Sequence, residues 1–285
     1  MSANHHFPVS VYIAGMLLLA LASVTHASPS AERALTFESR GVTLAGTLVM
    51  PTDAPTAAVI FVHGSGKQPR SLSVANAFAR HGIAALVYDK RGVGESGGEF
   101  EGNQSASGTN LELLAADAAA ALRALRGALA PDIPVGYAGI SQAGWIAPMA
   151  AQTEGADFLL MWSGPVCKVS EEDIFSKYTA DKDVRWVPRY AEALAARTRP
   201  YVWPDFLGRD TDSAEDLAAL DIPGLWLFGS QDGSVPVDLS IEKLEALQQA
   251  GHAYDYVVFS ETGHNNMSET FATAVDWVRR RINQP

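Results

Sequence analysis

The sequence predicts an α/β protein built on a mostly parallel sheet of about eight strands, with helices on both faces of the sheet. Three observations lead to this class. Several short runs are continuously apolar, which is typical of strands buried on both faces. Segments with helical spacing separate these runs, and the recurring strand–helix rhythm indicates parallel pairing. The chain has 285 residues and is 47% hydrophobic, so it can bury a large core.

The elements follow in order along the chain. Two alternating segments, 35–40 and 42–50, are joined at Gly41 and predict a hairpin. Continuously apolar runs then predict further strands at 57–62, 83–88, 134–140, 158–162, 224–228 and 254–259. Helical patterns are expected between and after them, at 71–82, from Thr109 to about Gly127, from Trp145 onward, from Asp238 to Gln249, and at 268–282.

Residues from about 165 to 215 interrupt this rhythm with helical and proline-containing segments and no predicted strand. They are rich in large aromatic side chains, namely Trp186, Tyr190, Tyr201 and Trp203. Because the segment separates two successive strands, we expect a helical cap inserted over the carboxyl ends of the sheet. The expected organisation is one domain, residues 28–285, that carries this insertion.

The N-terminal segment predicts export. Residues 9–24 are almost wholly apolar, and Thr25 and Ala27 supply small residues at the two positions that matter for cleavage. We therefore expect residues 1–27 to be a signal peptide, cut after Ala27, which sends the protein to the periplasm or the medium with no membrane attachment. An uncleaved anchor is the alternative, although the apolar stretch is short of the ~20 residues that a span needs.

Composition narrows the classes of partner and cofactor. The formal net charge is −11 and no basic patch stands out, which argues against a nucleic-acid partner. The single cysteine, Cys167, excludes an internal disulfide and is interpreted as a packing residue. No spacing of histidine and acidic residues suggests a metal site.

The stretch Gly139-Ile140-Ser141-Gln142-Ala143-Gly144 joins a predicted strand to a predicted helix. A serine in a tight strand–helix turn, with small residues two positions to either side, is typical of a nucleophile elbow, because strand and helix approach closely there. Ala143 departs from the strict pattern by one methyl group. The Gln142 amide would point to the space in front of Ser141, at a helix N-terminus that favours negative charge. An ordinary turn with Ser141 as a helix cap is the alternative.

Further polar residues follow other predicted strands, at the sheet edge where function gathers in parallel sheets. Asp232 and His264 come after Ser141 in the chain order of a serine–acid–histidine triad. His264 would take the proton of the serine hydroxyl, and Asp232 would orient the imidazole. The amides of Ser65 and Gln142 would form an oxyanion hole. Taken singly, Asp232 and His264 are equally well read as turn and loop residues; their joint placement favours the triad.

Five motifs carry a family resemblance: His63-Gly64-Ser65-Gly66, Tyr88 to Ser96 (YDKRGVGES), Gly139 to Gly144, Gly229-Ser230-Gln231-Asp232 with Val235-Pro236, and Gly263-His264. With them, the chain resembles the α/β-hydrolase fold enzymes, specifically bacterial exported serine hydrolases of the esterase and serine-aminopeptidase-like group. The resemblance spans about residues 35–282. It implies that Ser141, Asp232 and His264 act as nucleophile, acid and base, without cofactor or metal. It also implies that Asp89 to Gly94 form a structural loop near the site.

Together these features predict a serine hydrolase of carboxylesterase type, which cleaves a small-molecule ester through an acyl-enzyme. The aromatic insertion favours an apolar acyl or aryl group, although aromatic residues in such a segment are more often part of a core than of a ligand platform. A peptidase or amidase with the same triad, acting on an amide, is the first alternative. A non-catalytic binding protein on a hydrolase scaffold is the second, and the presence of all three triad residue types disfavours it.

Overall fold

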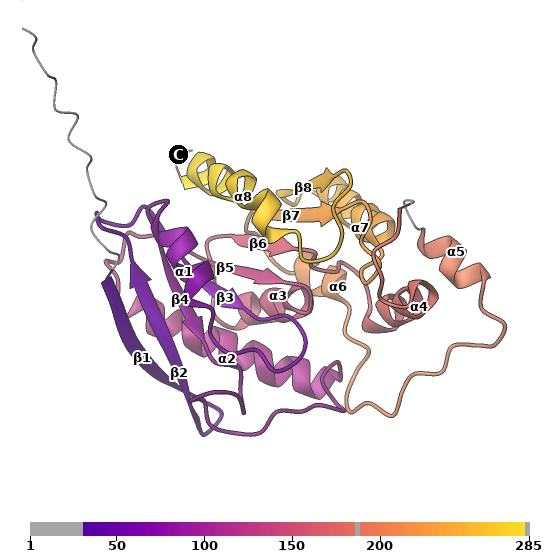
Figure 1. Ribbon diagram of the computed structural model, residues 1–285, viewed down its shortest axis with the longest axis horizontal. Coiled ribbons are helices and arrows are strands. Elements are labelled where there is room, and N and C mark those ends of the chain that lie inside the picture. Colours follow the sequence, from indigo (N-terminus) through magenta and orange to yellow (C-terminus); the bar gives the residue numbers. More distant parts are fainter. Residues whose placement is uncertain (1–30, 186–188, 283–285) are drawn as a thin grey trace, which may run out of the picture.

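A computed structural model describes residues 31–185 and 189–282 (Figure 1). The expected signal peptide, residues 1–27, and the aromatic residue Trp186 lie outside the described residues. In the part that is described, no helix combines the length and apolar character needed to cross a membrane.

The described strands form one eight-stranded sheet in the order β1-β2-β4-β3-β5-β6-β7-β8. β2 runs antiparallel to β1 and β4, and the remaining neighbours are parallel. The strands are β1 (Ala31–Ser39), β2 (Val42–Met50), β3 (Ala57–Val62), β4 (Ile83–Tyr88), β5 (Val135–Ile140), β6 (Leu159–Trp162), β7 (Gly224–Gly229) and β8 (Tyr254–Phe259). The predicted fold class, a mostly parallel sheet with flanking helices, is confirmed.

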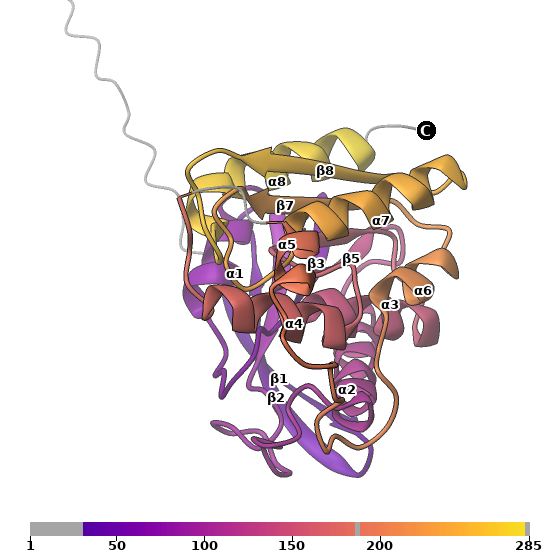
Figure 2. The same ribbon diagram turned by 90° about the vertical axis from the view of Figure 1, so that its right-hand side faces the viewer.

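Helices cover both faces of this sheet (Figure 1, Figure 2). The helices are α1 (Leu72–Ala79), α2 (Gly108–Arg126), α3 (Ala143–Thr153), α4 (Val169–Thr179), α5 (Tyr190–Ala195), α6 (Ser213–Ala218), α7 (Val237–Gln249) and α8 (Met267–Ile282). Apolar residues of α1 and α8 share one core with the sheet, and those of α2, α3, α6 and α7 share the other.

The central strands are apolar without interruption because both of their faces are covered. Along β3, Ile60 faces the core formed with α2 and α3, whereas Val59 and Phe61 face the core formed with α1 and α8. This alternation follows from the period of two in a strand. The same two-sided burial makes these strands recognisable in the sequence.

The sequence predicts Thr109 and Asp238 as the caps of two helices, and in each case the cap lies two residues earlier. Helix α2 begins at Gly108, and the hydroxyl of Ser107 accepts a hydrogen bond from the Asn110 amide, so Ser107 is the cap rather than Thr109. Helix α7 begins after Pro236, which places Asp238 inside its first turn. The Asp238 carboxylate accepts a hydrogen bond from the Tyr190 amide instead of capping α7.

The connection between β6 and β7 contains α4, α5 and α6. Helix α4 lies over the carboxyl ends of the strands, since Glu172 and Ser176 line the same cavity as Ser141. Figure 2 shows α4 and α5 together at the front of the molecule in that view. The rings of Tyr190 and Tyr201 pack against a small core of α4 and α5.

Candidate active site

Ser141 stands at the junction of β5 and α3 in a left-handed backbone conformation, with φ of 55°. The close approach of strand and helix is visible in the space around the flanking residues. A Cβ added at Gly139 would lie 2.4 Å from that of Ala143, and one at Gly144 would lie 2.6 Å from the ring of Pro165. Larger residues at these positions would push the turn apart, which is the physical reason for the small-residue pattern.

The structure brings Ser141, Asp232 and His264 together, although they lie on three separate loops. His264 Nε2 is 3.0 Å from the Ser141 hydroxyl oxygen, and His264 Nδ1 is 2.9 Å from Asp232 Oδ2. One imidazole therefore bridges a hydroxyl and a carboxylate, which is the geometry that proton transfer from serine requires.

Burial and hydrogen bonding fix Asp232 as the partner of His264. The Asp232 side chain is fully buried, and its Oδ1 accepts hydrogen bonds of 2.9 Å from the amides of Ser234 and Val235. Burial lowers the pKa of His264, but the hydrogen bond and charge of Asp232, with Asp183 and Asp181 nearby, outweigh it and raise the pKa overall. The site thus stabilises the imidazolium that would form when serine gives up its proton.

The predicted oxyanion donors are the backbone amides of Ser65 and Gln142, two residues close to Ser141. Ser65 lines the same cavity as Ser141, and Gln142 caps the start of α3. Neither amide donates a hydrogen bond to an acceptor in the part of the chain that the structure describes. Free amides at a helix start and an adjacent loop can bind a negative oxygen.

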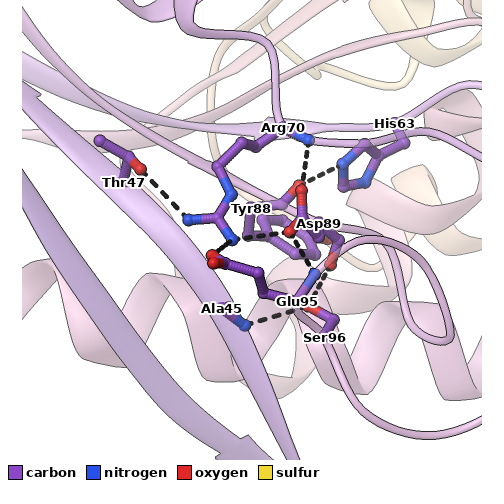
Figure 3. A network of polar contacts seen from close by, with 8 residues as sticks. All are labelled: Ala45, Thr47, His63, Arg70, Tyr88, Asp89, Glu95 and Ser96. Carbon is purple, nitrogen blue, oxygen red and sulfur yellow. Dashed lines mark hydrogen bonds and ion pairs between the residues drawn. The ribbon is translucent and has the colours of Figure 1, made fainter.

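The loop after β4 is held by the carboxylate of Asp89, which Figure 3 shows beside the guanidinium of Arg70. Arg70 donates to Asp89 through its amide, at 2.7 Å, and through Nη2, at 2.6 Å, and the Glu95 amide donates at 2.8 Å. Burial alone would raise the pKa of Asp89. The hydrogen bonds from Arg70 and Glu95 have the larger effect and lower this pKa to about 2. A Cβ at Gly94 would meet this carboxylate, so the loop needs glycine there.

A cavity of about 640 Å³ opens in front of Ser141. Its lining is polar, and Ile140 is the one apolar side chain among the described residues that form it. No aromatic side chain of the insertion lines this cavity among the described residues. Tyr190 and Tyr201 pack against the insertion's own core, and Trp203 packs against Phe206.

Carboxylates that the sequence analysis did not single out stand at this cavity. Glu172 of α4 and Asp181 line it opposite Ser141. The Glu172 carboxylate forms no hydrogen bond or ion pair within the described residues, and burial, then Asp181 and Asp173, raise its pKa to about 8. Nothing in the local sequence marks Glu172, since acidic residues are common in the first turn of a helix.

A short segment of the insertion, residues 180–184, reaches both loops that carry Asp232 and His264. Asp183 Oδ1 accepts a hydrogen bond of 2.9 Å from the His264 amide, and the Val184 amide donates to the Gln231 carbonyl at 2.9 Å. A Cβ at Gly233 would lie only 1.8 Å from the Lys182 carbonyl oxygen. We refer to residues 180–184 as the clamp segment.

Among residues 31–185 and 189–282, no group of three or more histidine, cysteine or acidic side chains is arranged to hold a metal ion. Cys167 is fully buried, and its carbonyl accepts a hydrogen bond from the indole of Trp145 at 2.8 Å. Its side chain is therefore part of the packing around α3.

Comparison with known proteins gives one family match. Residues 53–212, more than half of the chain, match the family model described as serine aminopeptidase, S33. Among curated proteins, none matches the sequence.

Solved structures share the fold at low sequence identity. The Pyrococcus furiosus esterase Pf2001 has a TM-score of 0.65 at 15% identity, covering 89% of this chain and 92% of that one. The Pyrococcus horikoshii acylaminoacyl peptidase has a TM-score of 0.67 at 14% identity, covering 91% of this chain and 43% of that one. A lipase in its open form has a TM-score of 0.63 at 19% identity, covering 89% and 100%. These likenesses confirm the α/β-hydrolase fold.

Proposed function

Because the chain belongs to the serine aminopeptidase S33 family of hydrolases, we propose that it cleaves carboxylic esters of small molecules through an acyl-enzyme on Ser141. The observation that supports this is the position of His264, whose two ring nitrogens are 3.0 Å from the Ser141 hydroxyl and 2.9 Å from the Asp232 carboxylate.

In the proposed reaction, Ser141 Oγ attacks the ester carbonyl carbon while His264 Nε2 takes the hydroxyl proton. The carbonyl oxygen becomes an oxyanion and accepts hydrogen bonds from the Ser65 and Gln142 amides. The ester C–O bond then breaks, and His264 returns its proton to the departing alcohol. Water, deprotonated by His264, attacks the acyl-enzyme and releases the acid, which restores Ser141.

The test is a reaction of the purified protein with a fluorophosphonate and with a series of p-nitrophenyl esters of increasing acyl length. We expect about one label per chain, located on Ser141 by peptide mapping, and turnover of the shorter esters. Parallel aminoacyl-anilides compare ester with amide cleavage. Labelling at another residue, or no turnover of any ester or anilide, would contradict the proposed function.

One observation favours a second candidate function, an aminopeptidase or aminoacyl esterase. Glu172 and Asp181 present carboxylates to the cavity in front of Ser141. The ammonium group of a substrate would supply the ion-pair partner that the Glu172 carboxylate does not have among the described residues, where Lys177 acts on it only at a distance. Such a substrate would carry a free amino group close to the scissile carbonyl.

The variant Glu172→Gln tests this second function. For an alanine ester or anilide, we expect KM to rise about 10-fold or more, because the ammonium loses a charged partner. For p-nitrophenyl butyrate, which has no charge, KM should stay nearly constant. Glu192→Gln, the same change on an exposed residue of α5, is the matched control. Equal effects of Glu172→Gln on both substrates would remove the case for amine recognition.

The same variant makes a prediction about stability and pH. The pKa of Glu172 is raised to about 8 in the folded chain, well above its unfolded value, so ionisation of this carboxyl destabilises the fold. The destabilisation begins above about pH 4.3, the ordinary pKa of glutamate, and is complete near the folded value. Glu172→Gln should therefore melt about 2–4 °C higher than the unaltered protein near pH 8, and the gap should close near pH 4.

A further inference from the structure

Lys90, the second residue after β4, is a buried cation that has no carboxylate partner among the residues that the structure describes. The residue is 3% exposed, and its Nζ donates to the Gly64 carbonyl oxygen and to Gln142 Oε1, each at 2.8 Å. Burial alone lowers the pKa of Lys90, to about 8, and no neighbouring charge raises it. A buried ammonium without a counter-charge is costly, so its retention calls for an explanation.

The two acceptors of Lys90 belong to the two halves of the candidate oxyanion hole. The Gly64 carbonyl and the Ser65 N–H are opposite ends of one peptide group. Gln142 carries the other free amide on its own backbone. A single ammonium therefore touches both units that present a free N–H toward the substrate carbonyl.

We propose that Lys90 is a positioning residue that fixes and polarises the oxyanion hole. An ammonium bonded to a carbonyl draws electron density from that peptide group, so its N–H becomes a stronger donor. The same contact holds the Gly64–Ser65 peptide in the orientation that directs its N–H toward the cavity. The proposal rests on the proposed function, since it assigns Lys90 to the oxyanion step of that reaction.

The surroundings hold this arrangement in place. The Gln142 side chain is oriented by its Nε2, which donates to the Ser105 carbonyl at 2.8 Å and so turns Oε1 toward Lys90. The Lys90 amide donates to the Gln68 carbonyl at 3.0 Å, and its ammonium lies 5.9 Å from the centre of the Phe100 ring.

Titratable groups near Lys90 come from the end of β3 and from the loop after β4. At the end of β3, burial first and the charge of Lys90 second lower the pKa of His63 to about 4. His63 is therefore neutral near pH 7, with Nε2 2.5 Å from the Tyr88 carbonyl oxygen. Arg91 and the loop residues Glu99 and Glu101 line a small cleft beside Lys90, and Asp89 precedes it. Since Asp89 is already bonded to Arg70, Lys90 is the group here that titrates near pH 8.

The variant Lys90→Met keeps the length of the side chain and removes its charge. We expect kcat for a p-nitrophenyl ester to fall about 10–100-fold, less than the loss of a direct oxyanion donor, with KM nearly unchanged. Affinity for a trifluoromethyl ketone, which forms an oxyanion on Ser141, should weaken by the same factor. Lys67→Met, which removes an exposed ammonium near the same Phe100 ring, should leave all three values unchanged.

The pH profile separates this role from a merely structural one. In the unaltered protein, kcat/KM should decline above about pH 8 as Lys90 loses its proton. Glu172 at the same cavity also has a pKa of about 8, so the two profiles are compared in a Glu172→Gln background. In that background Lys90→Met should abolish the alkaline decline, because the titrating ammonium is gone. Complete but slower labelling of the variant by a fluorophosphonate would show that Ser141 and His264 are intact in it.

The proposal is overturned if Lys90→Met keeps the kcat and the alkaline decline of the unaltered protein. If the variant does not fold, the unaltered protein still decides the question, since a kcat/KM that is flat to about pH 10 would overturn the proposal equally. An unaltered chain that neither labels nor turns over any ester would instead refute the proposed function, so the two failures are distinguishable.

Discussion

Replacing Ser141 by alanine is expected to lower kcat for p-nitrophenyl butyrate by at least about 10⁴-fold. The hydroxyl is the attacking atom in the proposed reaction, and neither His264 nor the free amides can replace it. The backbone at residue 141 has a φ of 55°, which alanine and serine tolerate equally poorly, so the melting temperature should change little. Initial rates and thermal melts of the same preparation measure both effects.

Ser234→Ala is the matched control for this variant. Ser234 lines the same cavity, but its amide bonds to Asp232 through the backbone, which alanine retains. Its activity should therefore remain within about threefold of the unaltered protein, as for a residue outside the reacting atoms. Full activity of Ser141→Ala would refute the assignment of the nucleophile, whatever the control shows.

Replacing Asp117 by leucine is expected to give the largest loss of stability, about 3–5 kcal/mol. Arg91 and Asp117 form a two-pronged ion pair between the loop after β4 and helix α2, and their side chains are 6% and 1% exposed. Arg91 also donates to the Ser39 carbonyl at 3.0 Å, so it cannot turn outward without breaking a second contact. Removing the carboxylate leaves a buried guanidinium unpaired, and Tm should fall by about 10 °C or more.

The double variant Arg91→Met with Asp117→Leu shows whether the unpaired charge is the cause. Both charges are absent there, and apolar side chains of similar size fill the site, so much of the lost stability should return. Chemical denaturation of both variants gives the two free energies of unfolding. If the double variant is less stable than Asp117→Leu alone, the loss reflects packing and not an uncompensated charge.

The fold and the proximity of Ser141, Asp232 and His264 could be predicted from the sequence, because both follow from how parallel strands are buried and connected. Two-sided burial makes strands such as β3 and β7 continuously apolar, and parallel strands deliver their following loops to one edge of the sheet. These regularities do not predict how side chains pack inside the insertion, which contains no strand among the described residues. Aromatic residues such as Tyr190 and Tyr201 are more often core than ligand contacts, but their sequence positions do not show which core they join.

Lys90 and Glu172 were missed for related reasons. The Lys90 ammonium donates to acceptors on Gly64 and Gln142, which are 26 and 52 positions away in the chain. A pattern of neighbouring residues therefore cannot predict these hydrogen bonds. The loop that contains Lys90 was expected to be structural, and its neighbours Asp89 and Ser96 do hold the turn together. Glu172 matters only through the cavity that it faces, and that cavity exists only once α4 has docked on the sheet.

The clamp segment, residues 180–184, limits how this enzyme can be re-engineered. Through Asp183 and Val184, it ties the loops of His264 and Asp232 to one another from outside the sheet. A chimaera in which another protein's insertion replaces the whole β6–β7 connection would keep Ser141. It would lose the hydrogen bonds that Asp183 and Val184 make to the loops of His264 and Asp232. Replacements that begin after Arg189 would retain the clamp segment. The later part of the insertion is therefore the part to exchange when the substrate range is to be altered.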